Sequence, residues 1–252
     1  MKRAMNSPDE QQQQQQGRGG GRGGRGRRQR QRRGGGGGGD NADVRISKAL
    51  SWALRHAAPE LGLTMGPDGY VPVQEILQHP HKKFRGATME DIRRVVETNA
   101  KQRFSLTERN GEMLIRANQG HSITTIDPYL LLTPIPPKDL ATMTTILHGT
   151  YMEPWEQHIR KEGLSLMSRT HIHFAAGMPG ENQVISGMRK SCGVYVYIDA
   201  EQCARDKIEF FSSANGVLLT AGVNNEGILP PKYFSKVVTK DGKVLLQQAN
   251  SA

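Results

Sequence analysis

Apolar positions first become periodic after residue 42. Five apolar residues recur with the i, i+3, i+4 and i+7 type of spacing that places side chains on one buried face of a helix. Asp43 is a suitable N-cap for this helix, and Pro59 is a suitable end. We therefore predict that order begins near Asp43 with an amphipathic helix. Its buried face consists of Ile46, Leu50, Ala53, Leu54 and Ala57.

The opposite face of this helix carries an aromatic ring among its charges. Its residues recur at i, i+3, i+7 and i+10 and are Arg45, Lys48, Trp52 and Arg55. A charged face is usually only solvated, but this one ends in a cation beside the titratable imidazole of His56. Arg55 and His56 are therefore candidate functional residues.

A short strand, two further helices and a hairpin are predicted next. Tyr70-Val71 follows the turn residues Asp68-Gly69 and precedes a helix that opens at Pro72. Thr88 begins a third helix with a pattern that resembles a capping box. Asn110-Gly111, between two apolar alternations, is a strong signal for a β-hairpin. The order helix, strand, helix, helix, hairpin is that of a winged helix, which often binds nucleic acid, although a fold alone does not fix function.

Two cations precede the hairpin. Lys101 and Arg103 alternate around Gln102, so strand spacing would place both side chains on one face. A bidentate arginine beside a lysine point charge makes a good phosphate clamp. The alternative interpretation is a hairpin edge that is merely basic.

Several prolines lie close together in the middle of the chain. Residues 123–144 predict an extended linker between two lobes. Residues 145–240 mix short helices with strands such as Val194–Ile198, which predicts an α+β half with a largely antiparallel sheet. We expect the last residues, 241–252, to fray. The prolines of the linker are Pro128, Pro134, Pro136 and Pro137.

A strand, a helix and a second strand at the start of this half suggest a ligand site. The first strand, Leu147–Thr150, ends in His-Gly-Thr, and a helix over Glu153–Glu162 stops at Gly163. His171 and His173 then alternate, which places both on one face of a strand. A cleft with imidazoles, a hydroxyl and a close approach at glycine suits a polar, phosphorylated ligand. Histidines in strands are as often structural, so this stretch alone leaves both interpretations open.

The charge of the chain is concentrated near its first residue. The net charge is +10, and residues 1–40 hold ten Lys/Arg and three Asp/Glu, so that only +3 remains for the other residues. The glutamine, arginine and glycine of residues 1–41 cannot bury enough apolar surface to fold, which predicts a disordered tail. Arginine-glycine segments can bind RNA, and a solubilising tail is the alternative.

Cysteine count and hydropathy limit the classes of protein. Cys192 and Cys203 make neither a disulfide framework nor a zinc site. No apolar run reaches the roughly 20 residues of a membrane span, and residues 1–40 lack the apolar region of a secretory signal. We therefore expect a soluble protein of the cytoplasm or the nucleus, without membrane contact.

Seven short segments in a fixed order carry a more specific signal. In chain order they are Ser47-Lys48 with Leu54-Arg55-His56, Lys101-Gln102-Arg103-Phe104, Ile115-Arg116-Ala117-Asn118-Gln119-Gly120-His121-Ser122, His148-Gly149-Thr150, Arg169-Thr170-His171-Ile172-His173, Ser186-Gly187-Met188-Arg189 and Ser213-Ala214-Asn215-Gly216-Val217. Together they resemble the NAD-dependent RNA 2′-phosphotransferases, the tRNA splicing enzymes. The resemblance covers roughly Val44 to Phe234.

The resemblance implies a fold and a reaction. Residues 42–122 would form a winged-helix RNA lobe, and residues 145–240 an ADP-ribosyltransferase-like lobe that holds NAD. The 2′-phosphate that splicing leaves on tRNA would attack the nicotinamide ribose of NAD and expel nicotinamide. The neighbouring ribose hydroxyl would then attack the phosphorus, which yields mature tRNA and ADP-ribose 1″,2″-cyclic phosphate. The implied partners are tRNA with an internal 2′-phosphate and NAD; no metal is implied, and we expect a monomer.

The resemblance also implies residue roles. A phosphate monoester is mostly a dianion at neutral pH, so the first step needs only positioning and charge compensation. The second step must deprotonate a hydroxyl, for which a histidine is the natural proton carrier. The implied catalytic residues are Arg55, His56 and Arg103. The implied RNA and phosphate ligands are Lys48, Lys101, Arg116, Gln119 and His121. The implied NAD contacts are His148, Gly149, Thr150, Arg169, His171, His173, Arg189, Asn215 and Gly216.

One position departs from the family pattern. Most members carry an arginine immediately before Ser-Ala-Asn-Gly-Val, where this chain has Ser212. One phosphate-facing cation is therefore missing, which predicts a slow second step. Arg205 and Lys207, just upstream, are the next candidates to supply that charge.

Two other functions remain open. An ADP-ribosyltransferase that modifies RNA or protein would share the sheet architecture, but the chain lacks an obvious catalytic glutamate at Ser-Ala-Asn-Gly-Val. An RNA-binding protein that has lost catalysis is supported by Ser212 and by the arginine-glycine tail. The presence of Arg55, His56, Lys101 and Arg103 opposes that alternative.

Overall fold

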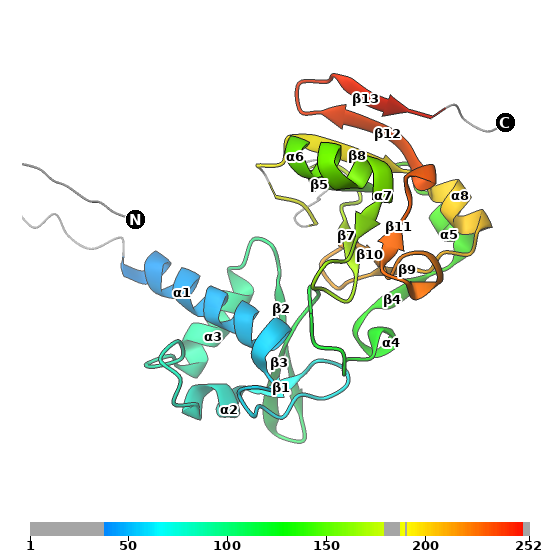
Figure 1. Cartoon of the computed structure of the whole chain (residues 1–252). Helices are drawn as coiled ribbons and strands as arrows, with labels where there is room; N and C mark the ends of the chain where they lie inside the picture. The colour runs from blue at the N-terminus through cyan, green and yellow to red at the C-terminus, as the bar shows by residue number, and fades with distance from the viewer. Residues whose placement is uncertain (1–37, 179–186, 190, 249–252) are drawn as a thin grey trace, which may run out of the picture. The chain divides into compact units, whose positions relative to one another are not determined.

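The computed structural model of the protein describes residues 38–178, 187–189 and 191–248 (Figure 1). Across these residues it is a mixed α+β fold with several small antiparallel sheets, which confirms the predicted fold class at that level. The predicted tail up to residue 37 and Ser186 of the sixth motif lie outside the described residues. None of the helices in these ranges combines the length and the apolar character that a membrane crossing requires.

The first helix, α1 (Gly38–Trp52), begins before the predicted cap and continues into a π-helical turn, η1 (Ala53–Ala57). Asp43 does not cap it, because its carboxylate accepts hydrogen bonds from Arg94 Nε at 3.0 Å and Nη2 at 2.7 Å. The predicted start of the helix is therefore wrong. The predicted apolar face is confirmed, since all five of its residues are buried.

The predicted order of helix, strand, helix, helix and hairpin is present. Thr88 Oγ1 accepts the Asp91 N–H and the Asp91 carboxylate accepts the Thr88 N–H, so the capping box is complete. Asn110 and Gly111 have φ angles of 52° and 78°, the left-handed backbone that a two-residue hairpin turn requires. The three strands form an antiparallel sheet in the order β1-β3-β2. The elements are β1 (Val71–Pro72), α2 (Val73–Gln78), α3 (Met89–Glu97), β2 (Phe104–Arg109) and β3 (Glu112–Ala117).

The structure differs from an extended linker over residues 123–144. The segment contains α4 (Pro128–Leu131), β4 (Thr133–Ile135) and α5 (Pro137–Ala141), and β4 pairs with a strand of the second half. Proline is compatible with all three elements, because it suits the first turn of a helix and an edge strand, where it loses no ladder hydrogen bond. A proline-rich segment can therefore be ordered without resembling a regular helix or strand.

The second half has the elements predicted around the His-Gly-Thr strand. Gly163 ends the helical segment with a φ angle of 100°, as predicted. The expected fraying from residue 241 is wrong for residues 244–247, which pair with the strand before them. The elements are β5 (Leu147–Thr150), α6 (Met152–Pro154), η2 (Trp155–Ile159), α7 (Arg160–Glu162), β6 (Leu164–Ser165), β7 (Ile172–Phe174), β8 (Val194–Ile198), α8 (Ala200–Arg205), β9 (Phe210–Ser212), β10 (Leu218–Thr220), η3 (Val223–Asn225), β11 (Ile228–Leu229), η4 (Pro231–Tyr233), β12 (Phe234–Thr239) and β13 (Val244–Gln247).

Two four-stranded sheets contribute to the main core of this half. Their strand orders are β4-β9-β10-β7 and β13-β12-β8-β5. Phe174 and Phe210 of the first sheet meet Val196 and Phe234 of the second in one buried cluster. Phe211 points the other way, as strand alternation requires, and packs with residues near α4. β5 and β7, which carry the candidate histidines, are therefore edge strands of two sheets that share one core.

Candidate functional site

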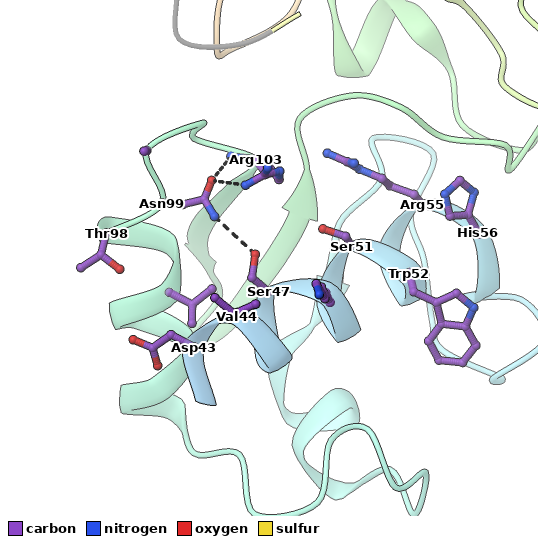
Figure 2. Close-up of a pocket in the computed structure, with 13 residues that line it drawn as sticks. Asp43, Val44, Ser47, Ser51, Trp52, Arg55, His56, Thr98, Asn99 and Arg103 are labelled. Carbon is purple, nitrogen blue, oxygen red and sulfur yellow. Dashed lines mark hydrogen bonds between the residues drawn. The ribbon is translucent and has the colours of Figure 1, made fainter. Parts of the chain in front are cut away.

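A basic pocket of about 830 Å³ lies along α1, η1 and the end of α3 (Figure 2). In Figure 2 the guanidinium ends of Arg55 and Arg103 extend toward each other, and His56 lies beside Arg55. The structure thus brings together the three residues predicted to be catalytic. Lys48, predicted to bind phosphate, also lines the pocket.

Arg55 is a partly buried cation without a carboxylate partner among the described residues. Its side chain packs on the backbone of Gly120, where an added Cβ would lie 3.4 Å from Arg55 Nε, and this Nε has no hydrogen-bond partner among the described residues. Burial, together with the charges of Arg103 and Arg169, lowers the Arg55 pKa to about 10. No carboxylate of the described residues forms an ion pair with these three arginines. The pocket therefore has a strong electrostatic preference for an anion.

Asn99 holds the Arg103 loop in place. Its Oδ1 accepts hydrogen bonds from Lys101 N at 3.2 Å, Arg103 N at 3.3 Å and Arg103 Nη1 at 3.1 Å. Its Nδ2 donates to Ser47 Oγ at 3.4 Å, which ties the loop to α1. The sequence-based prediction missed Asn99, although an asparagine at the start of a tight turn is a recognisable signal.

Lys101 and Arg103 do not share a face. Gln102 between them has a φ angle of 42°, a left-handed backbone that breaks strand alternation. Arg103 consequently lines the pocket, whereas Lys101 Nζ donates to the carbonyl of Met188 at 3.3 Å. Asn215 Nδ2 in turn donates to the Lys101 carbonyl at 2.9 Å. The proposed two-residue clamp is therefore replaced by one cation in the pocket and one beside the segment around Met188.

His56 is arranged to accept a proton. Its Nδ1 lies 2.9 Å from Ser122 Oγ, and this hydroxyl is also 3.5 Å from the Arg55 carbonyl. When Ser122 donates to that carbonyl it accepts from Nδ1–H, which leaves Nε2 as the basic nitrogen. Burial lowers the pKa of His56, and the charges of Arg55 and Arg169 lower it further. His56 is therefore neutral at neutral pH.

A chain of hydrogen bonds fixes the histidines of the second half. His148 Nδ1 lies 2.8 Å from the His173 carbonyl, and His173 Nδ1 lies 2.9 Å from the His171 carbonyl. Carbonyls only accept, so both Nδ1 atoms carry the proton. Burial lowers both pKa values, that of His173 to about 3, so both rings are neutral with Nε2 as an acceptor. The Gln119 side chain, 2.9 Å from His173 Nε2, must then present its amide nitrogen to the ring.

Gly149 is required by a close approach. A Cβ there would overlap the Met188 side chain and lie 3.0 Å from Cys192 Sγ. The adjacent Thr150 is buried, and its carbonyl accepts the Gly193 N–H at 3.0 Å. The predicted tight approach at this glycine is present, and in this structure Met188 makes it.

Other predicted ligands have different surroundings. Arg116 stacks on the Tyr70 ring at 4.6 Å and donates to the Asp68 carbonyl. Burial lowers the pKa of His121 to about 3, so its ring is neutral. His121 and His171 line a second cavity of about 350 Å³ rather than the basic pocket. The positions of Arg116 and His121 suit structural roles more than contact with phosphate.

The charge of Arg169 acts both on residues of the basic pocket and on the histidines of β5 and β7. It is exposed in the loop before β7. Arg189 is close enough to affect its charge state. Gly216 forms a left-handed turn with a φ angle of 73°. The charge of Arg169 lowers the pKa values of Arg55, His56, His148 and His173.

Metal ligands and disulfides were also sought. Within the described ranges, no group of three or more His, Cys, Asp or Glu side chains is arranged to hold a metal ion. Cys192 and Cys203 are both buried free thiols.

Comparison with known proteins finds similarity along most of the chain. Residues 41–222 match the family model described as RNA 2′-phosphotransferase, Tpt1 / KptA family. The tRNA 2′-phosphotransferase 1 of Homo sapiens is 50% identical over 199 residues, which cover 78% of this chain and 76% of that protein. The tRNA 2′-phosphotransferase 1 of Danio rerio is 49% identical over 199 residues, which cover 78% of this chain and 86% of that protein. The tRNA 2′-phosphotransferase of Saccharomyces cerevisiae is 38% identical over 204 residues, which cover 80% of this chain and 86% of that protein.

Proposed function

Because the chain belongs to the Tpt1 / KptA family of RNA 2′-phosphotransferases, we propose that it transfers the splice-junction 2′-phosphate of ligated tRNA to NAD. The products are mature tRNA, nicotinamide and ADP-ribose 1″,2″-cyclic phosphate. The elements up to residue 122 act as a winged-helix RNA lobe. Residues from 145 onward act as an ADP-ribosyltransferase-like lobe that takes NAD as a consumed co-substrate.

The observation that carries this proposal is the partly buried guanidinium of Arg55, whose Nε is buried without a hydrogen-bond partner among the described residues. It faces Arg103 across the basic pocket, and no carboxylate among the described residues neutralises either group. A phosphate dianion supplies the missing negative charge and accepts bidentate hydrogen bonds from arginine. The pocket therefore suits the phosphate that reacts.

In the first step the protein positions the nucleophile and does not have to move a proton. A phosphate oxygen forms a bond to the anomeric carbon of the nicotinamide ribose, and the bond to nicotinamide breaks with its electron pair. Nicotinamide leaves as a neutral molecule. Arg55 and Arg103 hold the phosphate, and catalysis in this step consists of orientation and charge compensation.

The second step needs a proton carrier, and His56 is suited to it. The ribose 2″-hydroxyl loses its proton to His56 Nε2 and attacks the phosphorus, and the bond from phosphorus to the RNA 2′-oxygen breaks. His56 then returns the proton to that oxygen. A base must be neutral before it acts, and the lowered pKa of His56 meets this requirement. Ser122 supports both protonation states, because its hydroxyl accepts the Nδ1–H whether or not Nε2 carries the transferred proton.

The donor set of the second half fits a ribose. NAD supplies the electrophilic carbon and the leaving group. His148, with Nδ1 committed to the His173 carbonyl, offers Nε2 as an acceptor for a ribose hydroxyl. His173 is held neutral by burial, so it adds no charge repulsion toward the cationic nicotinamide ring. Gly149 leaves room on β5 for the Met188 side chain.

We expect phosphate removal to require NAD. Incubated with an RNA that carries one internal 2′-phosphate, the protein should release nicotinamide and convert the RNA to its 2′-hydroxyl form, with EDTA present or absent. Without NAD the RNA should remain unchanged. Release of inorganic phosphate without NAD would identify a phosphatase instead. Persistent ADP-ribosylated RNA, with no loss of phosphate, would identify an RNA ADP-ribosyltransferase.

The second step should depend on pH through His56. Because the neutral ring is the base, its rate should rise with pH through the His56 pKa and then level off. Arg169→Gln removes a positive charge that disfavours protonated His56, so the His56 pKa should rise and the acidic limb should move to higher pH. Single-turnover rates against pH measure the shift, with Arg160→Gln on α7 as the matched control. If the acidic limb of the pH–rate profile does not move, a group other than His56 controls the pH dependence of the second step.

Ser212→Arg should accelerate the second step. Ser212 Oγ is 3.4 Å from the Ser213 carbonyl and can offer the phosphate only one neutral hydrogen bond, whereas arginine can offer two charged ones. The natural protein should therefore accumulate ADP-ribosylated RNA 2′-phosphate, and Ser212→Arg should remove that accumulation. Time courses with end-labelled RNA measure it directly.

If no intermediate accumulates and Ser212→Arg changes nothing, another cation supplies the charge. Arg205 is a poor candidate, because it pairs with Glu201 at 3.1 Å on α8. Lys207 follows the same helix, where its N–H donates to the Ala204 carbonyl at 3.1 Å. Arg169, which influences both Arg55 and His56, is the cation to replace next.

A further inference from the structure

Trp52, His81 and Lys83 form a cluster beside the basic pocket. Trp52 lines the pocket together with Arg55 and His56, and Figure 2 shows its indole on the same side of the helix as the His56 ring. Lys83 Nζ lies 3.5 Å from the centroid of the indole, and the His81 ring centroid lies 5.0 Å away at an angle of 37°. We call these three residues the Trp52 cluster.

The loop that supplies two of these residues is firmly held. His79 Nδ1 accepts the His81 N–H at 3.1 Å, and His81 Nδ1 accepts the Lys83 N–H at 3.2 Å. Phe84 anchors the end of the loop in the core, where it is 3% exposed. Arg45 Nη1 donates to the Lys83 carbonyl at 3.1 Å and ties the loop to α1. The positions of His81 and Lys83 over Trp52 are therefore built into the fold.

The cluster continues a row of functional side chains on one helix face. Lys48, Trp52 and Arg55 follow at i, i+4 and i+7, and all three line the pocket. An RNA strand whose reacting phosphate is held by Arg55 would meet an aromatic ring, Trp52, and then another cation, Lys48, along this row. Alternating cations and stacking surfaces are what single-stranded RNA needs, because phosphates and bases alternate along it.

We propose that the Trp52 cluster binds the nucleotide adjacent to the one that carries the 2′-phosphate. Its base stacks on the indole and against His81, and its phosphate is neutralised by Lys83 and Lys48. Base stacking on an aromatic ring is stronger than an exposed cation–π contact, so the base displaces Lys83 from the ring and frees its ammonium for the phosphate. This inference rests on the proposed function, since it assumes that RNA reacts at Arg55.

The test compares two substrates. One is a mononucleotide with a 2′-phosphate, and the other is a trinucleotide with the same 2′-phosphate on its middle residue. The unaltered protein should show a kcat/KM about tenfold higher for the trinucleotide. Lys83→Met, which keeps the aliphatic stem over the ring, and Trp52→Leu should each bring this ratio close to one. Trp52→Tyr should preserve most of it, and Lys138→Met, an exposed lysine on α5, should leave it unchanged.

Fluorescence gives a readout that does not depend on catalysis. The chain has two tryptophans, and Trp155 is 1% exposed, so Trp52 is the one that a ligand can reach. An unphosphorylated trinucleotide, added without NAD, should quench the emission of the natural protein and leave that of Trp52→Leu unchanged.

The outcomes separate the two proposals. Equal kcat/KM values for the two substrates, or no quenching of the natural protein, would overturn the role of the Trp52 cluster and leave the proposed reaction intact. A protein that acts on neither phosphorylated substrate would count against the proposed reaction. In that case quenching would still decide whether the Trp52 cluster binds RNA.

Discussion

His56→Ala is expected to stop the reaction after the first transfer. The attacking phosphate is already ionised, so nicotinamide release needs no base and should continue for one turnover. The second step loses its proton carrier, which should lower its rate by about 10²- to 10⁴-fold. ADP-ribosylated RNA 2′-phosphate should therefore accumulate to nearly one equivalent per protein molecule. Nicotinamide release and gel analysis of end-labelled RNA, both in single turnover, measure the two steps separately.

Two further variants make this result specific. His158→Ala removes an exposed histidine from η2, far from the pocket in sequence, and should leave both steps unchanged. Ser122→Ala removes the partner of Nδ1 and should slow the second step less than His56→Ala does. An equal loss in both steps of His56→Ala would show that His56 positions the phosphate and carries no proton.

Arg103→Ala should impair both steps. In the proposed reaction Arg103 faces the phosphate in the first transfer and again when charge builds up on the phosphorus in the second. Losing one such donor typically costs about 10²- to 10³-fold in rate. Arg103→Lys should recover only part of the loss, because lysine lacks the planar fork. Single-turnover rates at saturating NAD and RNA measure the effect.

Asn99 and residues 1–37 provide the controls for this prediction. Asn99→Ala leaves the charge of Arg103 intact but removes its hydrogen-bonded support, so a smaller loss is expected. Removal of residues 1–37 should leave the single-turnover rate largely unchanged. If the shortened protein is inactive while Arg103→Ala retains its rate, the reacting phosphate is bound elsewhere.

Features that depend on nearby residues were predicted correctly. The capping box of Thr88 and Asp91 and the turn at Asn110-Gly111 depend on a few consecutive positions. The stop at Gly163 depends on one residue that tolerates a φ angle of 100°. Arg55 and His56 were singled out by the unusual composition of one helix face. Their grouping with Arg103 in one pocket agrees with the prediction, and their roles remain to be tested by the variants above.

Features that depend on distant residues could not be predicted from local patterns. Alternation suggested a shared face for Lys101 and Arg103, and the left-handed backbone of Gln102 separates them. The hydrogen bond from Asn99 Nδ2 to Ser47 Oγ joins the loop after α3 to α1, 52 positions away. The Gln119 contact with His173 joins residues 54 positions apart. Each of these contacts exists only once two elements have packed together, so it has no periodic signature in the sequence.

The π-helical turn η1 has a consequence for how the chain can change length. Such a turn holds more residues than an α-helical turn, much as if one residue had been inserted into α1. Deleting Ala53 would let the regular hydrogen-bond ladder run on, and the helix itself would lose nothing by it. Because the wide turn already absorbs one extra residue, the segment after it would keep roughly its present orientation, whereas a deletion earlier in α1 would rotate Arg55 and His56 by about 100° around the helix axis. The π-helical turn is therefore the part of this helix where a one-residue change in length alters the direction of the proposed catalytic side chains least.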